Sequence, residues 1–79
     1  MGSKRPLTQV IYELEIITSD GSEVKEEFAV SYDSEFYDED RESTDAIFVH
    51  MRMADMREKY GDDTLLLEYT IERSTQILH

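Results

Sequence analysis

Hydrophobic and polar residues alternate along three segments of this chain, as they do in half-buried β-strands. The segments cover about residues 8–18, 22–32 and 64–74. In each of them, one set of alternate positions is mainly apolar and the other is rich in charged residues. The sequence therefore predicts three strands of a sheet with one buried face. The predicted inward residues are Val10, Tyr12, Leu14, Ile16, Val24, Phe28, Val30, Tyr32, Leu65, Leu67, Tyr69 and Ile71.

The loop that ends at Gly21 determines how the first two strands pair. A two-residue turn would place Leu14 opposite Glu27 and mix apolar with charged side chains on both faces. A three-residue loop, with Gly21 in the positive φ of a bulge, places Ile16 opposite Val24 and keeps one face apolar. A slip of one residue would turn every side chain over, so the pattern predicts the three-residue loop.

Between the second and third strands, residues 44–60 carry apolar side chains at helical spacing. Ser43 or Thr44 is the predicted N-cap, Asp45 would complement the helix dipole, and Gly61 is placed to end the helix. The stripe expected to cover the sheet consists of Ala46, Val49, Met53, Met56 and Tyr60.

The element order is strand, strand, helix, strand, without repeats or a linker. A right-handed crossover from the second strand places the third strand beside the first and antiparallel to it. We therefore predict an α+β fold of two layers (ββαβ), with a three-stranded antiparallel sheet in the order 2-1-3 and one helix on one face. At 79 residues, the chain is expected to form a single domain over residues 1–79.

The formal charge of −11 comes from 19 acidic residues against eight Lys and Arg. Such a charge disfavours direct binding to nucleic acid or to an anionic membrane and favours basic protein surfaces. It also keeps a small protein soluble. No apolar run approaches the ~20 residues that cross a bilayer, and no signal peptide is evident. The absence of Cys fits a reducing compartment, so we expect a cytoplasmic protein.

Residues 33–42, the predicted connector before the helix, are unusually acidic. An EF-hand would need Gly at the sixth position of its loop and Glu at the twelfth. Counted from Asp38, these positions hold Ser43 and Val49, so the calcium spacing fails. We expect no metal site and no cofactor.

Catalysis has few candidate residues in this sequence. His50 is the only internal histidine, and it borders the helical stripe, where a lone His is usually packed or hydrogen-bonded. The sequence contains no nucleophile elbow and no Gly-rich phosphate loop. We therefore predict that the protein is not an enzyme and has no catalytic residues.

The face of the sheet away from the helix is predicted to be rich in glutamate. An open antiparallel face exposed only to water is common. Apolar residues at its margins, Ile11, Ile17 and Leu66, are more typical of an interface. The predicted partner-binding glutamates of this face are Glu13, Glu15, Glu27, Glu68 and Glu72.

The acidic connector supplies a second set of predicted partner contacts: Asp33, Glu35, Phe36, Tyr37, Asp38, Glu39 and Asp40. The two aromatic rings would either anchor a contact or fold back over the small core. Ile47 and Met51 form a separate helical stripe with Ala54. This stripe is either a second interface or is partly buried by a roll of the helix.

The predicted hairpin, helix and strand, with an acidic surface, resemble the small phage-encoded inhibitors of host enzymes, among them an inhibitor of bacterial RNA polymerase. The resemblance rests on topology and charge and assigns no role to any residue. It implies an inhibitor that occupies a basic surface of a partner, such as the nucleic-acid-binding surface of an enzyme, with carboxylates in place of phosphates. The alternative is a homodimer or larger homo-oligomer that pairs through its exposed strand edges or through the second helical stripe.

Overall fold

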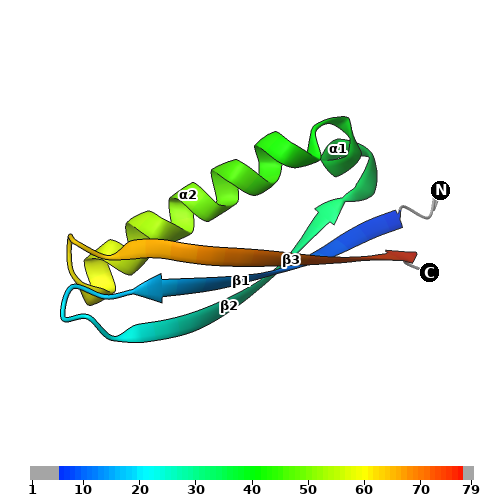
Figure 1. The fold of residues 1–79 in the computed structure, drawn as a ribbon. Coiled ribbons are helices and arrows are strands. Elements are labelled where there is room, and N and C mark those ends of the chain that lie inside the picture. The colour runs from blue at the N-terminus through cyan, green and yellow to red at the C-terminus, as the bar shows by residue number, and fades with distance from the viewer. Residues whose placement is uncertain (1–5, 78–79) are drawn as a thin grey trace.

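The computed structural model describes the backbone of residues 6–77 and the side chains of residues 6–75. Its elements are β1 (Pro6–Ile17), β2 (Glu23–Asp33), the short α1 (Ser34–Glu39), α2 (Arg41–Tyr60) and β3 (Leu65–Ile77). The strands form an antiparallel sheet in the order β2-β1-β3, and α2 lies across one face (Figure 1). The predicted α+β fold and strand order are confirmed. The ends of the predicted single domain, residues 1–5 and 78–79, lie outside the described residues.

The hairpin of β1 and β2 has the register predicted from the pattern of side chains. Ile16 pairs with Val24 and Tyr12 pairs with Phe28. Gly21 has a φ of 88°, and its amide donates to the carbonyl of Thr18 at 2.9 Å. The three-residue loop therefore keeps the apolar side chains of both strands on the face below α2, which we call the inner face.

A β-bulge shifts the pairing of β3 with β1 near the start of β3. It places Leu66 opposite Ile16 and on the inner face, where it packs against the core. Leu65 and Leu67 are 61% and 51% exposed. The prediction that these two residues face inward and Leu66 outward is wrong, because the extra residue of a bulge reverses the alternation.

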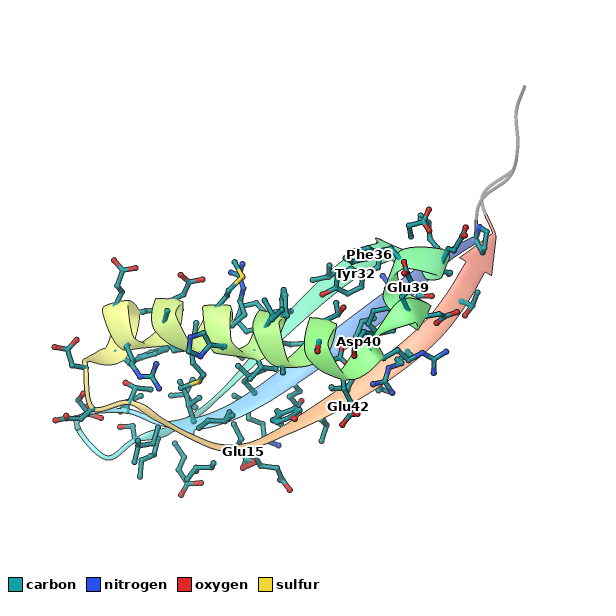
Figure 2. The ribbon with its side chains drawn as sticks, turned by 90° about the horizontal axis from the view of Figure 1, so that it is seen from above. Glu15, Tyr32, Phe36, Glu39, Asp40 and Glu42 are labelled. Carbon is teal, nitrogen blue, oxygen red and sulfur yellow. The ribbon has the colours of Figure 1, made fainter. Side chains whose placement is uncertain are left out.

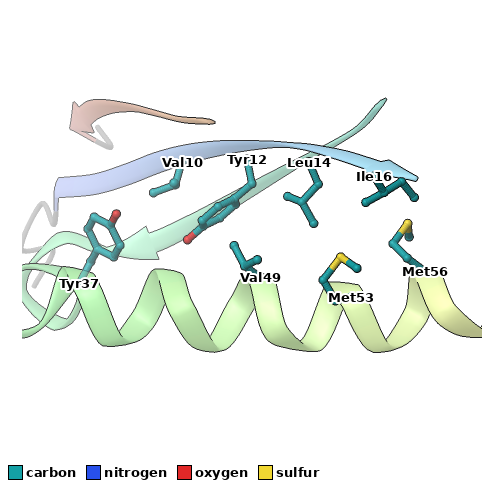
Figure 3. Close-up of a cluster of buried hydrophobic side chains, with 8 residues drawn as sticks. All are labelled: Val10, Tyr12, Leu14, Ile16, Tyr37, Val49, Met53 and Met56. Carbon is teal, nitrogen blue, oxygen red and sulfur yellow. The ribbon is translucent and has the colours of Figure 1, made fainter. Parts of the chain in front are cut away.

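The core lies between the sheet and the two helices (Figure 3). Because β1 is the central strand, every second side chain from Val10 to Ile16 is completely buried. Phe48 belongs to neither predicted stripe of the helix, yet its ring stacks on that of Tyr12 with centroids 4.2 Å apart. The buried hydrophobic residues of the core are Val10, Tyr12, Leu14, Ile16, Tyr37, Val49, Met53 and Met56.

The stripe of α2 that covers the sheet differs from the prediction at its N-terminal end. Ala46, predicted to face the sheet, is exposed, whereas Asp45 is only 5% exposed. Asp45 lies one turn before Val49 and continues the buried stripe. A charged residue takes the inner position because the core supplies hydrogen-bond donors for it, as described below.

Residues 33–42 do not form the irregular connector that the sequence predicts. The carboxylate of Asp33 accepts from two backbone amides of α1 and caps that helix. The carboxylate of Asp40 accepts from the amide of Ser43 at 3.1 Å and caps α2. The predicted cap at Ser43 or Thr44 is therefore wrong, because the acidic residues themselves start both helices.

The helix α2 ends at Gly61, as predicted. Gly61 has a φ of 115°, and its amide donates to the carbonyl of Arg57 at 2.9 Å. A side chain at this position would collide with that of Ser19. Glycine is therefore required where the end of α2 closes on the β1–β2 loop.

Candidate protein-interaction surfaces

Six glutamates and one lysine project from the face of the sheet that α2 leaves uncovered, which we call the outer face. Glu13 of β1 pairs with Glu27 of β2, and Glu15 lies between Lys25 and Glu68. The register thus brings the predicted binding glutamates of three strands together on one face. They are Glu13, Glu15, Glu27, Glu68 and Glu72, and Glu23 joins them.

Two pairs of carboxylates on the outer face oppose each other directly. Like charges in such cross-strand positions cost roughly a few tenths of a kcal/mol each. Apolar side chains flank them, at Ile11 and Ile17 of β1 and at Leu65 of β3. Leu65 takes the position predicted for Leu66, because of the bulge. The outer face is therefore acidic at its centre and apolar at its margins.

The carboxylates before α2 divide into structural and exposed ones. Asp33 and Asp40 cap helices, and Asp38 forms an ion pair of 2.9 Å with the next basic residue along the chain. Glu35 and Glu39 are exposed. Two of the six acidic residues in 33–42 therefore begin helices, and a third pairs with Arg41.

The two aromatic rings of α1 point in different directions. Tyr37 is fully buried, and its ring stacks on that of Tyr32 with centroids 5.0 Å apart. Phe36 is 59% exposed. The prediction that Tyr37 belongs to the partner surface is wrong, since a buried side chain cannot contact a partner. Phe36 is exposed and could still contact a partner protein.

Phe36 borders an apolar groove of about 300 Å³ between α2 and β2, which we call the β2 groove. Figure 2 labels two of its lining residues, Phe36 and Tyr32. Ile47 and Met51, the predicted second stripe of the helix, lie in it and are 59% and 55% exposed. The helix therefore does not roll to bury this stripe. The groove is lined by Val30, Tyr32, Phe36, Thr44, Ile47, Phe48 and Met51.

A buried polar network joins Asp45 to three donors, and sequence reasoning missed it. The hydroxyl of Tyr12 donates to Oδ1 of Asp45 at 2.6 Å, and that of Tyr37 donates to the same oxygen at 2.8 Å. Arg73 donates to Oδ2 at 2.7 Å and, from Nε, to the hydroxyl of Tyr37. The network ties β1, α1, α2 and β3 together at one end of the core.

Burial keeps the two network tyrosines protonated. Burial and the hydrogen bond to Asp45 raise the pKa of Tyr12. Burial also raises the pKa of Tyr37, although the hydrogen bond from Arg73 opposes it. Hydrogen bonds to Tyr37 and Asp45 raise the pKa of Arg73. Both oxygens of Asp45 are thus occupied by internal donors, and the arrangement serves to position the helices on the sheet.

One signal in the sequence could have revealed this network. Asp45 lies four residues before Val49 and eight before Met53, so it continues the apolar stripe more regularly than Ala46 does. An acid in such a position needs partners. Arg73 has the same parity as Tyr69 and Ile71, which are predicted to face inward, so simple alternation already places it on the inner face opposite Val10.

Other chemical features of the described chain are few. His50 is exposed on α2. Within residues 6–77, no three His, Cys, Asp or Glu side chains are placed to hold a metal ion, and no helix is long and apolar enough to cross a membrane.

Comparison with known proteins adds no relative: no protein-family model matches the sequence, and no curated protein or solved structure shows significant similarity to it.

Proposed function

We propose that this protein binds a basic surface of a partner protein through the outer face of its sheet, and thereby inhibits or modulates that partner. The observation that carries the proposal is the arrangement of six glutamates against one lysine on an uncovered face. Carboxylates placed opposite each other reduce stability, and a face that only meets water does not require them. A basic partner would turn the same repulsion into attraction.

A partner surface that binds nucleic acid is one target of this kind. Successive outward residues of a strand lie about 6.7 Å apart, and a duplex carries about four phosphates over that length. A row across the three strands holds at most two glutamates, as at Glu15 and Glu68. The outer face would therefore compete for a few phosphate contacts rather than copy a duplex.

A role as a phage-type inhibitor in the cytoplasm stays a prediction from topology and charge.

Two variants that remove equal charge test whether position matters. Glu13→Gln, Glu15→Gln and Glu68→Gln neutralise the outer face. The second variant, which we call the loop variant, carries Glu58→Gln, Asp62→Asn and Asp63→Asn. It neutralises three exposed carboxylates in the last turn of α2 and in the loop that follows. Both triple variants have the same net charge, so a difference between them cannot come from net charge alone.

The experiment is capture of partners from a cell extract on the immobilised proteins, eluted with rising salt. We expect the wild type and the loop variant to retain a nucleic-acid-binding enzyme at low salt, and the outer-face variant to retain at least about tenfold less. Added DNA or RNA should displace the captured enzyme. Equal retention by all three proteins would contradict the proposal.

Self-association is the alternative, because β2 and β3 are both edges of the sheet described for residues 6–77. Light scattering of the isolated protein distinguishes the two. A stable dimer whose contact buries the outer face would exclude the proposed binding role.

A further inference from the structure

The edge of β2 carries an uncharged stretch in a chain that is otherwise highly charged. β2 is an outer strand of the sheet, so its free side meets no other strand of residues 6–77. Residues 28–32 of β2 contain no charged side chain, although Glu27 precedes them and Asp33 follows them. Natural proteins usually protect exposed strand edges with charges, proline or bulges. This stretch has none of these.

The β2 groove lies beside the same stretch. Val30 and Tyr32 of β2 line one side of the groove, and Ile47 and Met51 of α2 line the other. A helix is about 10 Å wide and neighbouring strands lie about 4.8 Å apart. The exposed stripe of α2 is therefore placed to cover the inner face of a strand next to β2, at a position that the described sheet leaves empty.

We propose that an extended segment of a partner protein adds to the free edge of β2 as a fourth strand and places apolar side chains in the β2 groove. Backbone hydrogen bonds to residues 28–32 would give affinity, and alternate side chains would give specificity. This inference does not depend on the outer-face proposal, because it uses a different surface.

The charges beside the free edge of β2 indicate which kind of segment could add to it. A second copy paired about Val30 would place its Asp33 opposite Glu27 and its Glu27 opposite Asp33, and each chain carries a net charge of −11. These contacts repel. A segment with Lys or Arg at both positions would instead be attracted by the exposed Glu27 at one end. At the other end it would meet the negative charge around α1, where Asp33 caps the helix and Glu35 and Glu39 are exposed. The groove therefore fits a segment with an apolar centre and basic flanks.

Strand alternation defines the pattern of that segment. Apolar side chains would face Phe28, Val30 and Tyr32 on the inner face, and basic side chains would face Glu27 and Asp33 on the outer face. The peptide Lys-Val-Thr-Val-Thr-Val-Lys has this pattern and reads the same in both directions, so it tests parallel and antiparallel addition together. We would use it with a fluorescent label, and its Glu-flanked counterpart as the control peptide.

Matched variants test the groove. Ile47→Gln with Met51→Gln makes the groove polar without changing charge. Ala46→Gln with His50→Gln makes equivalent changes at exposed positions of α2 outside the groove. By fluorescence anisotropy, the groove variant should bind the peptide at least about tenfold more weakly than the wild type, and the control within about twofold. Circular dichroism and thermal unfolding confirm that both variants fold.

N-methylated peptides test the mode of binding. Methyl groups on alternate amides block one hydrogen-bonding edge of a strand and leave the other free. We expect one of the two alternate sets to abolish binding and the other to retain it. Loss of binding with both sets would indicate a helical ligand and overturn the proposal, as would equal binding of the groove and control variants.

Three further results would overturn the proposal: tight binding of the Glu-flanked peptide, failure of the Lys-flanked peptide to bind, and a dimer of the protein that protects residues 28–32. The outer-face variant with Glu13, Glu15 and Glu68 changed to Gln should bind the peptide within about threefold of the wild type, because these side chains lie outside the groove. The two proposals can therefore fail separately.

Discussion

The two faces of the sheet place the same chemical group, a carboxylate, in opposite surroundings. On the inner face, Asp45 is 5% exposed and accepts hydrogen bonds from two tyrosines and Arg73. On the outer face, Glu13 lies opposite Glu27, and Glu15 opposite Glu68. The inner acid contributes to folding. The outer acids oppose it, so stability does not explain their arrangement, and the proposed binding role would.

The largest expected effect is loss of the inner carboxylate. Asp45→Asn leaves the Arg73 guanidinium without its charged partner and gives the Tyr12 and Tyr37 hydroxyls a poorer acceptor. Removing one member of a buried ionic network costs about 3–5 kcal/mol. Because the Arg73 side chain is 39% exposed, we expect about 3 kcal/mol, measured as the loss of unfolding free energy in urea.

The control for this variant is an exposed ion pair. Asp38→Asn removes the partner of Arg41, in a pair whose side chains are more than half exposed. Exposed pairs contribute about 0–1 kcal/mol, so this change should cost less than about 0.5 kcal/mol. If Asp45→Asn and Asp38→Asn cost the same, the inner network does not hold the fold together.

The second-largest expected effect is a loss of folding stability at high pH, caused by the two buried tyrosines of the inner network. Burial raises the pKa of Tyr12 and of Tyr37, so the stability that they contribute is present below the unfolded value near 10. It falls at higher pH, because the unfolded tyrosines ionise and the folded ones do not. At pH 11 we expect a loss from Tyr12 alone on the order of 1 kcal/mol relative to pH 9.

Urea unfolding at pH 9 and pH 11 measures this loss. Tyr12→Phe should be less stable than the wild type at pH 9 but should lose less stability between the two pH values. An equal loss in the variant and the wild type would show that Tyr12 does not titrate differently on folding.

Adjacent aromatic residues of α1 provide a smaller contrast. Tyr37→Phe removes a hydroxyl that accepts from Arg73 and donates to Asp45, and should cost about 1–2 kcal/mol. Phe36→Gln changes a side chain that is 59% exposed and should alter stability by less than about 0.5 kcal/mol. Thermal unfolding of the two variants gives the comparison, and a larger effect at Phe36 would contradict the orientations described for the two rings.

The sequence predicts the strands, their register and the topology because alternation and loop length restrict these strongly. Ile16 faces Val24 as the side-chain pattern requires. The orientations of the side chains at the start of β3 are predicted wrongly. Residues 65–67 are three successive leucines, so they show no alternation that would locate the bulge. The outer-face glutamates were predicted correctly as one surface because they follow from register alone.

The connector escaped prediction for a different reason. The sequence predicts partner contacts at Asp33 and Asp40, whereas in the structure their carboxylates cap α1 and α2. Local helix capping and partner binding require the same residue types, so composition cannot separate them. The opposite orientations of Phe36 and Tyr37 depend on the partners of the Tyr37 hydroxyl, which lie on α2 and β3 and are distant in sequence.

The smallest predicted effect tests the central claim most directly. We would measure the unfolding free energy of two triple variants in urea at low salt. The first is the outer-face variant, with Glu13→Gln, Glu15→Gln and Glu68→Gln. The second is the loop variant, with Glu58→Gln, Asp62→Asn and Asp63→Asn.

If the outer carboxylates oppose folding, the first variant should be more stable than the wild type by about 0.5 kcal/mol, since relief of two like-charge pairs outweighs the lost attraction of Glu15 to Lys25. The second variant should stay within about 0.5 kcal/mol of the wild type, and added salt should reduce the gain of the first. An outer-face variant less stable than the wild type would show that these glutamates hold the sheet together, and would contradict the account.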